Sequence, residues 1–217
     1  MADFIIYIGN KNYSSWSLRG WLMLKHTGAG FTEEVIALDE AGTRANILRH
    51  SPSARVPALK QGEFVVWESL AIGEYLAELF PAAQLWPKPA TARAVARAAS
   101  SEMHAGFATL RSHLPMNIRS SFPNRGVTPE AQADINRITA LWRDCRRRFG
   151  EDGEFLFGAF TIADAMFAPV VSRFRTYKIE LDDEAQRYAD AVWALPMMQE
   201  WAAAARNEPA IIEKYEF

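Results

Sequence analysis

The sequence is poor in cysteine, in net charge and in long apolar runs. Its 217 residues include one cysteine, Cys145, which excludes an internal disulfide and a cysteine-rich metal site. The four histidines lie far apart with no HxxxH spacing, so we expect no metal. No apolar run reaches about 18 residues, so we expect no membrane span. A net charge of −2 gives no basic face for a phosphate backbone, and nucleic acid is not an expected partner.

The chain also lacks the start of a secretory signal, which is a basic segment followed by an apolar one. Hydrophobic residues make up 49% and charged residues 23% of the chain, and this composition excludes a disordered protein. We therefore expect a globular cytoplasmic protein with one large domain or two modest ones.

The first part of the chain alternates strand and helix patterns. Residues 4–8 are nearly all apolar and β-rich, which predicts a buried strand in a sheet covered on both faces. Helical spacing over residues 14–26 ends at a glycine-rich stop around residue 29. The further elements are predicted as a strand at the apolar end of 31–38, a helix around 42–50, a hairpin of 57–60 and 64–67, and a helix over 69–80.

The second part of the chain carries almost no strand signal. Apolar residues spaced three and four apart predict one long amphipathic helix from Val95 to Leu114 and a second from Ala131 to Phe149. Cys145 lies on the apolar stripe of the second helix, so we expect a core residue and no nucleophile. Shorter helices are predicted at 162–178, 184–194 and 197–206. Prolines around residue 85 mark a linker, so we expect an α/β domain over 1–82, a linker over 83–91 and an all-helical domain over 92–217.

Three serines, Ser14, Ser15 and Ser17, lie where the first strand gives way to the first helix. A helix N-terminus presents unpaired amides and the positive end of the helix dipole, which together bind anions. Serine is also a favoured N-cap residue. One cap needs only one serine, so the segment by itself leaves both capping and a hydroxyl-based site open.

Two further segments have both a structural and a functional interpretation. The stretch of Arg55, Val56 and Pro57 puts a proline directly before a short strand, which is compatible with a cis bond or with an ordinary trans proline at a strand edge. The pair Glu68 and Ser69 ends the hairpin and enters a helix. Ser69 is either the N-cap of that helix, or it holds a ligand carboxylate while Glu68 holds an amine.

A Thr-x-x-Asp sequence, formed by Thr161 and Asp164, precedes an apolar helical pattern. The two side chains of such a box satisfy backbone donors at the helix start reciprocally. We therefore expect a structural capping box here and no catalytic role.

Taken in order along the whole chain, these segments resemble the glutathione transferase superfamily, of the serine type and nearest to zeta-like bacterial members. The serine segment 14–19 is similar to the Ser-Ser-Cys-x-x-Arg sequence of the zeta class, with Trp16 in place of the cysteine. The other matches are Val56-Pro57 with the cis-proline turn, Glu68-Ser69 with the pair that binds the γ-glutamyl end of glutathione, and Thr161-x-x-Asp164 with the folding box of the family. The resemblance implies an α/β thioredoxin-like N-terminal domain followed by an all-α helical bundle.

The resemblance also implies glutathione as co-substrate and no metal. Ser14 would donate a hydrogen bond to the glutathione sulfur, with Ser15 as the alternative donor. The backbone of Val56, which precedes Pro57, would pair with the cysteinyl part of glutathione. Arg55 would lie beside the glycyl end. Glu68 and Ser69 would hold the γ-glutamyl amine and carboxylate.

The physical demand on such a site is modest. A thiol with a pKa of about 8.5 is mostly protonated at neutral pH, and lowering its pKa by about two units requires about 2.7 kcal/mol. A charged hydrogen bond contributes about 1.5–3 kcal/mol and the helix dipole about 0.3–1 kcal/mol. One serine hydroxyl at a helix N-terminus is therefore sufficient.

Three activities fit the resemblance. The first is conjugation of glutathione to small electrophiles. The alternatives are a glutathione-dependent cis–trans isomerase of the maleylacetoacetate type and a non-catalytic glutathione-binding protein. Trp16 in place of the zeta-class cysteine argues against the isomerase, and the lack of a nearby cysteine argues against thiol exchange through the enzyme. Because the family usually forms twofold dimers, we expect a homodimer.

We expect the electrophile to bind between the two domains, against the first long helix and its end. Arg19, on the first helix, would either orient an acidic substrate or form an ion pair. The other candidates for this half of the site are His104, Phe107, Arg111, His113, Met116 and Asn117. Periodicity does not decide which of them face the cleft.

Overall fold

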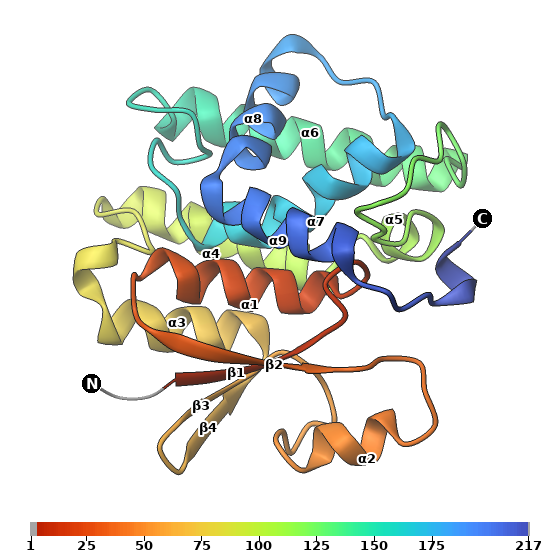
Figure 1. The fold of residues 1–217 in the computed structure, drawn as a ribbon. Coiled ribbons are helices and arrows are strands. Elements are labelled where there is room, and N and C mark those ends of the chain that lie inside the picture. Colours follow the sequence, from red (N-terminus) through yellow and green to blue (C-terminus); the bar gives the residue numbers. More distant parts are fainter. Residues whose placement is uncertain (1–3, 217) are drawn as a thin grey trace.

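A computed structural model describes residues 4–216, and these form a four-stranded sheet with three helices followed by a helical bundle (Figure 1). The elements of the sheet half are β1 (Phe4–Gly9), α1 (Ser15–His26), β2 (Phe31–Ile36), α2 (Thr43–Leu48), β3 (Ala58–Gln61), β4 (Phe64–Trp67) and α3 (Ser69–Leu79). The helical half contains α4 (Ala90–Ala105), α5 (Ala108–His113), α6 (Pro129–Phe149), α7 (Ile162–Tyr177), α8 (Asp183–Ala194) and α9 (Pro196–Asn207). The predicted order of elements in the sheet half and the predicted fold class are confirmed.

The sheet has the strand order β2-β1-β3-β4, with β1 parallel to β2 and antiparallel to β3. In Figure 1, α1 and α3 lie on one side of the sheet and α2 on the other. The alternating side chains of β1 follow this arrangement. Ile6 and Ile8 are fully buried in the core, while the ring of Tyr7 stacks on His50 with 4.1 Å between centroids. The predicted buried strand, covered on both faces, is confirmed.

The second strand begins earlier than its apolar residues indicate. β2 starts at Phe31 and ends at Ile36, so the apolar residues Ala37 and Leu38 lie beyond it. The strand lies at the edge of the sheet, and four of its six residues are exposed. An exposed edge strand tolerates the polar residues Thr32 to Glu34. The apolar pattern did not include these residues in the predicted strand.

The predicted long helix from Val95 to Leu114 is wrong, because the chain forms two helices there. α4 ends at Ala105, Gly106 is extended, and Phe107 adopts a left-handed conformation with φ of 56° before α5 begins. Met103 and Leu110 are buried on either side of the break, so the apolar spacing continues through it. Gly106 falls in line with this spacing, but glycine is a poor helix former and ends α4 here.

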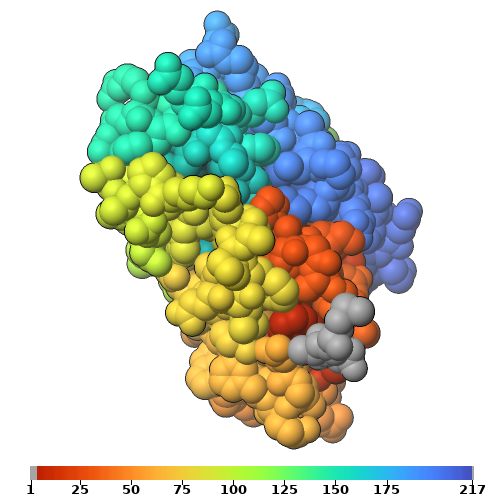
Figure 2. All heavy atoms as spheres, turned by 90° about the vertical axis from the view of Figure 1, so that its left-hand side faces the viewer, coloured from red at the N-terminus to blue at the C-terminus, as the bar shows by residue number. Residues whose placement is uncertain are grey.

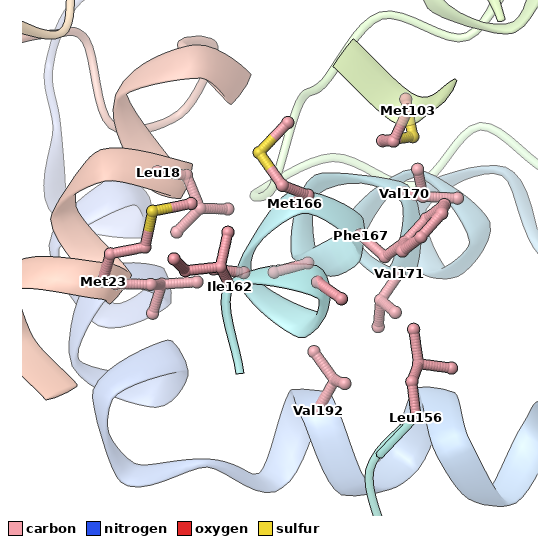
Figure 3. Packing of buried hydrophobic residues seen from close by; sticks show 14 of the residues in the cluster. Leu18, Met23, Met103, Leu156, Ile162, Met166, Phe167, Val170, Val171 and Val192 are labelled. Carbon is pink, nitrogen blue, oxygen red and sulfur yellow. The ribbon is translucent and has the colours of Figure 1, made fainter. Parts of the chain in front are cut away.

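Helix α7 forms the centre of the helical half (Figure 3). Its residues Ile162, Met166 and Phe167 are fully buried, and the figure shows Ile162 facing Leu18 and Met23 of α1. The helix begins at the predicted capping box. The Asp164 carboxylate accepts hydrogen bonds from Thr161 N at 2.8 Å and from Thr161 Oγ1 at 2.9 Å, which confirms the structural role of the pair.

The two halves pack on each other through α1. Figure 2 shows the red-orange surface of α1 enclosed between the yellow of α3 and α4 and the blue of the C-terminal helices. The contacts include polar ones, since Arg19 Nε donates to Met166 O at 2.9 Å and Ile162 N donates to Leu85 O at 2.9 Å. Within residues 4–216, no helix is both long and apolar enough to cross a membrane.

Candidate glutathione and acceptor site

A cavity of about 680 Å³ lies where the N-terminus of α1 meets the helical half. Its walls come from segments far apart in the sequence: the β1–α1 loop, the turn before β3, the start of α3, the end of α4, α5, α7 and the C-terminal segment. All residues predicted to activate or bind glutathione lie in the wall of this one cavity. They are Ser14, Ser15, Arg55, Val56, Pro57, Glu68 and Ser69.

The three serines at the start of α1 differ in their hydrogen bonds. Ser14 is the N-cap, and its Oγ accepts from Ser17 N at 3.4 Å and donates to Ser17 Oγ at 2.7 Å. Ser17 Oγ also accepts from Gly9 N at 2.9 Å, which ties α1 to the end of β1. The Ser15 hydroxyl has no hydrogen-bond partner within residues 4–216. A capping hydroxyl and an unpaired hydroxyl at the cavity wall therefore occur together in this segment.

The Val56–Pro57 bond is cis, one of the two alternatives left open by the sequence. Pro57 is buried and packs against α1 at Gly20. A Cβ at position 20 would lie 3.0 Å from Pro57 Cγ, so only glycine lets the turn and the helix approach this closely. This contact fixes Val56 at the cavity wall beside the N-terminus of α1.

The structure corrects the N-cap interpretation of Ser69. The N-cap of α3 is Glu68, with a φ of 70° and no capping hydrogen bond from its side chain, and Ser69 is the first helical residue. The Ser69 hydroxyl makes only a weak contact with Met166 Sδ at 3.9 Å. A strained backbone and an unused hydroxyl at a cavity wall are typical of a binding site.

The Glu68 carboxylate reaches across to the helical half, where its Oε2 lies 3.0 Å from His104 Nε2. Both side chains are partly exposed in the cavity. Glu68 is therefore placed to hold a cationic group of a ligand in exchange for, or together with, the imidazole.

Tyr13 also lines the cavity, and the sequence reasoning did not single it out. Its hydroxyl donates to Glu216 Oε1 at 2.6 Å and accepts from Arg119 NH2 at 2.6 Å and Ile212 N at 3.2 Å. Burial and the hydrogen bond to Glu216 raise the pKa of Tyr13 above its usual value of 10. This hydroxyl is fully engaged and un-ionised near neutral pH, so it is a poor activator of a thiol.

The C-terminal segment closes part of the cavity. Ile212, Lys214 and Tyr215 line it, and Lys214 forms an ion pair with Asp39 of the loop after β2. No motif in the sequence pointed to these residues. Neither helical periodicity nor turn chemistry predicts which part of the protein an irregular terminal segment packs against.

Of the residues expected in the acceptor half, His104, Arg111 and Met116 line the cavity, whereas Phe107, His113 and Asn117 do not. Phe107 forms the break between α4 and α5, His113 is exposed, and the Asn117 side chain is buried in a hydrogen bond with Asn12. Periodicity failed to separate these groups because the helix breaks within the stretch.

The expected ion pair of Arg19 is wrong, since its guanidinium has no carboxylate partner within residues 4–216. The side chain is fully buried, and its Cζ lies 4.3 Å from the centroid of the Trp16 ring. Trp16 in turn lines the cavity and makes an edge contact with His104, with 5.1 Å between centroids. For a metal, residues 4–216 contain no suitable group of three or more histidine, cysteine, aspartate or glutamate side chains.

Comparison with known proteins identifies this architecture. The family model for the glutathione S-transferase N-terminal domain matches residues 13–79, and the model for the C-terminal domain of the same family matches residues 92–204. The chain belongs to the glutathione S-transferase family. The predicted family is thereby confirmed, and with it the expectation of a glutathione transferase.

Curated relatives of this glutathione transferase include proteins named as isomerases. A probable maleylacetoacetate isomerase of Caenorhabditis elegans is 32% identical over 179 residues, which cover 82% of this chain and 81% of that protein. The maleylacetoacetate isomerase of Rattus norvegicus is 26% identical over 184 residues, again 82% of this chain and 81% of that protein. The expected likeness to the zeta class is confirmed by these relatives.

Solved structures agree on the fold. A glutathione transferase homologue from Burkholderia GL BGR1, solved with bound glutathione, is 24% identical and has a TM-score of 0.72, covering 96% of this chain and 100% of its own. A diazinon-metabolizing glutathione S-transferase of Bombyx mori is 15% identical with a TM-score of 0.73, covering 94% and 98%. At these identities the likeness concerns the fold alone.

Proposed function

We propose that this glutathione transferase binds glutathione against the sheet half of the cavity and transfers its thiolate to a small electrophile. The observation that supports the proposal most is that the α1 N-terminus, with its serine hydroxyls, and the weakly bonded Ser69 hydroxyl meet at one cavity. The serine segment, the turn before β3 and the start of α3 converge there, as binding of an extended tripeptide requires.

The proposed thiolate donor is Ser14, and a chain of hydrogen bonds behind it supports this role. Gly9 N–H donates to Ser17 Oγ, which lies 2.7 Å from Ser14 Oγ. A hydroxyl proton is free to rotate. When Ser14 turns its proton to the sulfur, Ser17 donates to the vacated Ser14 oxygen. Hydrogen bonds in such a chain polarise one another, so the terminal hydroxyl becomes a stronger donor to the anion.

Ser15 is the competing donor, because its hydroxyl needs no rearrangement to face a ligand. At the first position of α1 it lies among the amides and the positive dipole end that stabilise an anion. In the proposed complex its amide or hydroxyl supports the thiolate, while Ser14 makes the principal bond.

The other residues of the cavity wall bind the remaining parts of glutathione in the proposed complex. The backbone of Val56 pairs with the cysteinyl unit beside the buried Pro57. The Ser69 hydroxyl holds the γ-glutamyl carboxylate and Glu68 its ammonium group. Arg55, which is exposed at the rim, binds the glycyl carboxylate. Each charge of the tripeptide thereby receives a partner of opposite sign or a hydrogen-bond donor.

The test is the ultraviolet titration of the thiolate of enzyme-bound glutathione. In the wild type we expect a thiol pKa about two units below the usual value of about 8.5. Ser14→Ala should raise that pKa by at least about one unit and lower kcat/KM by at least about tenfold, because a charged hydrogen bond is lost. Ser17→Ala should produce a smaller shift in the same direction.

Two results would count against this assignment. If Ser15→Ala raises the thiol pKa and Ser14→Ala does not, the donor is Ser15 and the hydroxyl chain has only a capping role. If no variant and no wild-type complex shows a lowered thiol pKa, the proposed activation of glutathione is wrong.

Glutathione-dependent cis–trans isomerisation is the second candidate, because the relatives from Caenorhabditis elegans and Rattus norvegicus are named maleylacetoacetate isomerases. An isomerase regenerates glutathione, whereas a transferase consumes it. Incubation with maleylacetoacetate and with an aryl halide, followed by measurement of free thiol, separates the two activities. A protein that binds glutathione but does neither is the non-catalytic alternative.

We also propose a homodimer, a cytoplasmic location, and the division into 1–82, 83–91 and 92–217. Phe64 and Trp67 support the dimer, since these two large side chains are 53% and 41% exposed on the edge strand β4. Sedimentation at micromolar concentration should give twice the chain mass of 24.4 kDa. A monomer at that concentration would contradict the dimer.

A further inference from the structure

One histidine lies in the cavity wall beside the place proposed for the thiolate. His104 belongs to the last turn of α4, and its side chain is 32% exposed in the cavity. Its ring makes an edge contact with Trp16, with 5.1 Å between the centroids and 65° between the planes. Because Trp16 directly follows Ser15, the imidazole lies at the border between the proposed glutathione half and the acceptor half of the cavity.

The two nitrogens of this imidazole differ in their contacts. Nε2 lies 3.0 Å from Glu68 Oε2, whereas no hydrogen bond of Nδ1 occurs within residues 4–216. The backbone behind the ring is fixed as well, because Arg111 NH1 donates to Met103 O and to His104 O, both at 3.2 Å. The ring is therefore oriented through one nitrogen, and the other nitrogen remains available to a ligand.

The contact with Glu68 suits an imidazole that gives a proton away. A charged imidazole carries a hydrogen on both nitrogens, so Nε2 can stay bonded to Glu68 while Nδ1 releases its proton. Glu68 is available for this contact, since the other carboxylate in the cavity wall, Asp39, is paired with Lys214. Contacts between partly exposed charged groups add little to stability, so the fold itself has little need of this pair.

The neighbouring side chains of the wall are poor proton donors by comparison. Imidazole is the side chain that ordinarily exchanges a proton near neutral pH. Arg111 and Arg173 also line the cavity, but a guanidinium group keeps its proton in proteins. The Tyr13 hydroxyl already donates to Glu216, and its raised pKa makes it a weaker acid still. Met116, which lines the cavity too, has no proton to give.

We propose that His104 is a catalytic proton donor to the electrophile, so that the cavity is suited to the addition of glutathione to carbonyl-activated double bonds. Such an addition leaves an enolate, which must receive a proton before the product is complete. Substitution at an aryl halide needs no proton, because halide leaves as a stable anion. The inference rests on the proposed thiol transfer, since it concerns the second substrate of that reaction.

With an enone such as 4-phenyl-3-buten-2-one, the step balances as follows. The thiolate sulfur bonds to the carbon β to the carbonyl group, and the π electron pair of the C=C bond moves toward the carbonyl oxygen to give the enolate. The N–H bond of the charged imidazole breaks, and its proton goes to the α carbon. Water then returns a proton to the imidazole, which replaces the proton that glutathione lost when its thiolate formed. Overall, one S–H adds across one C=C bond.

The experiment measures kcat/KM for this enone and for the aryl halide 1-chloro-2,4-dinitrobenzene. The ratio of the two values cancels any change in glutathione binding, because both reactions share it. His104→Gln keeps an N–H group for the contact with Glu68 but has no proton that ionises near neutral pH. We expect this variant to lower the ratio of enone to halide by at least about tenfold, because general acid catalysis contributes about 10²–10⁴-fold.

The matched control is His113→Gln, because His113 is exposed on α5 and lies outside the cavity wall. This variant should keep the wild-type ratio. In His104→Ala, added imidazole should restore part of the enone rate and leave the halide rate as it was. A further measurement uses the wild type alone, so it does not depend on the folding of a variant. The enone reaction should be slower in D₂O than in H₂O, by a larger factor than the halide reaction.

The outcomes separate this inference from the proposed transfer. If His104→Gln leaves the ratio of enone to halide unchanged, or if the two wild-type reactions show the same effect of D₂O, His104 is not the donor and the transfer stands. Conjugation of the halide without conjugation of the enone would also overturn the inference alone. If the protein consumes glutathione with neither compound, the proposed transfer is wrong and the inference is wrong with it.

Discussion

The hydroxyl oxygen of Ser14 lies 2.7 Å from that of Ser17. The Ser17 oxygen in turn accepts a hydrogen bond from Gly9 N. The sequence offered two interpretations of this segment, a helix cap and a ligand site, and treated them as competitors. In the structure Ser14 caps α1 from the wall of the cavity, so its role as a cap does not conflict with the proposed role at the ligand site. A single sequence shows that a serine suits a helix start, but only the neighbours show where its proton points.

Asp164 is a second residue whose environment sets its chemistry. It is fully buried, and burial raises the pKa of its carboxyl group to about 6, although the hydrogen bonds from Thr161 and Leu156 lower it in part. The usual value in an unfolded chain is about 3.9. Because the folded protein holds the proton more tightly, this group stabilises the fold below about pH 4, and the contribution is lost as the pH rises through about 6.

We predict that Asp164→Asn removes this part of the pH dependence. Between about pH 4 and 6 the wild type should lose about 2–3 kcal/mol of unfolding free energy through this group, and the variant should lack that loss. Urea unfolding at several pH values measures it. The control is Asp183→Asn, an exposed residue in the first turn of α8, which should keep the wild-type slope. An unchanged slope in Asp164→Asn would contradict the raised pKa.

At the scale of elements, the close approach of α1 to the turn before β3 decides where the backbone of Val56 lies, which we propose to bind glutathione. Gly20 is the residue that permits it, because a Cβ there would lie 3.0 Å from Pro57 Cγ and 3.3 Å from Pro57 Cβ. Pro57 is a rigid and buried neighbour that has little room to shift.

We predict that Gly20→Ala destabilises the protein and raises KM for glutathione. Overpacking costs about 1–3 kcal/mol, which exceeds the gain of about 1 kcal/mol in helix propensity. Thermal unfolding and glutathione kinetics measure the two effects. Gly30→Ala is the control, since a Cβ at that position meets nothing within 4 Å and should change little. Equal behaviour of the two variants would show that the approach of α1 to Pro57 is not tight.

Elements differ in how well their pattern predicts them. The helix α6 follows its stripe of spaced apolar residues, because Ile135, Trp142 and Cys145 are all buried as the spacing requires. The same spacing failed at the α4–α5 break, because α5 stays packed on α6 after the chain turns at Gly106 and Phe107. Periodicity reports which residues face a core, and it does not report whether the backbone between them is continuous.

At the scale of the whole molecule, the end of α9 holds the loop that precedes the serine segment. The Glu208 carboxylate accepts from Lys11 N at 3.1 Å, Asn12 N at 3.0 Å and Asn10 Nδ2 at 3.1 Å. Trp201 Nε1 donates to Lys11 O at 2.9 Å from the same helix. A contact across almost 200 positions therefore orients the N-terminus of α1.

We predict that Glu208→Ala destabilises the fold and lowers kcat together. The loop amides lose their acceptor, which costs about 1–3 kcal/mol when such donors are shielded from water. Denaturant unfolding and steady-state kinetics measure the change. Glu200→Ala is the matched control on α9, because Glu200 makes only an exposed ion pair with Lys25. If both variants behave alike, Glu208 does not position the serine segment.

The sequence by itself determined the two-part architecture, the family and the segments that meet at the cavity. These follow from local patterns: apolar periodicity, turn residues and the order of short motifs, each of which acts over a few residues of chain. Only the tertiary structure decided that Arg19 has no ion partner among residues 4–216, that Tyr13 is engaged by the C-terminal segment, and that Arg111 and Arg173 line the same cavity as Tyr13. Contacts of this kind join residues of distant elements, and their geometry depends on how the two halves pack, which no local pattern encodes.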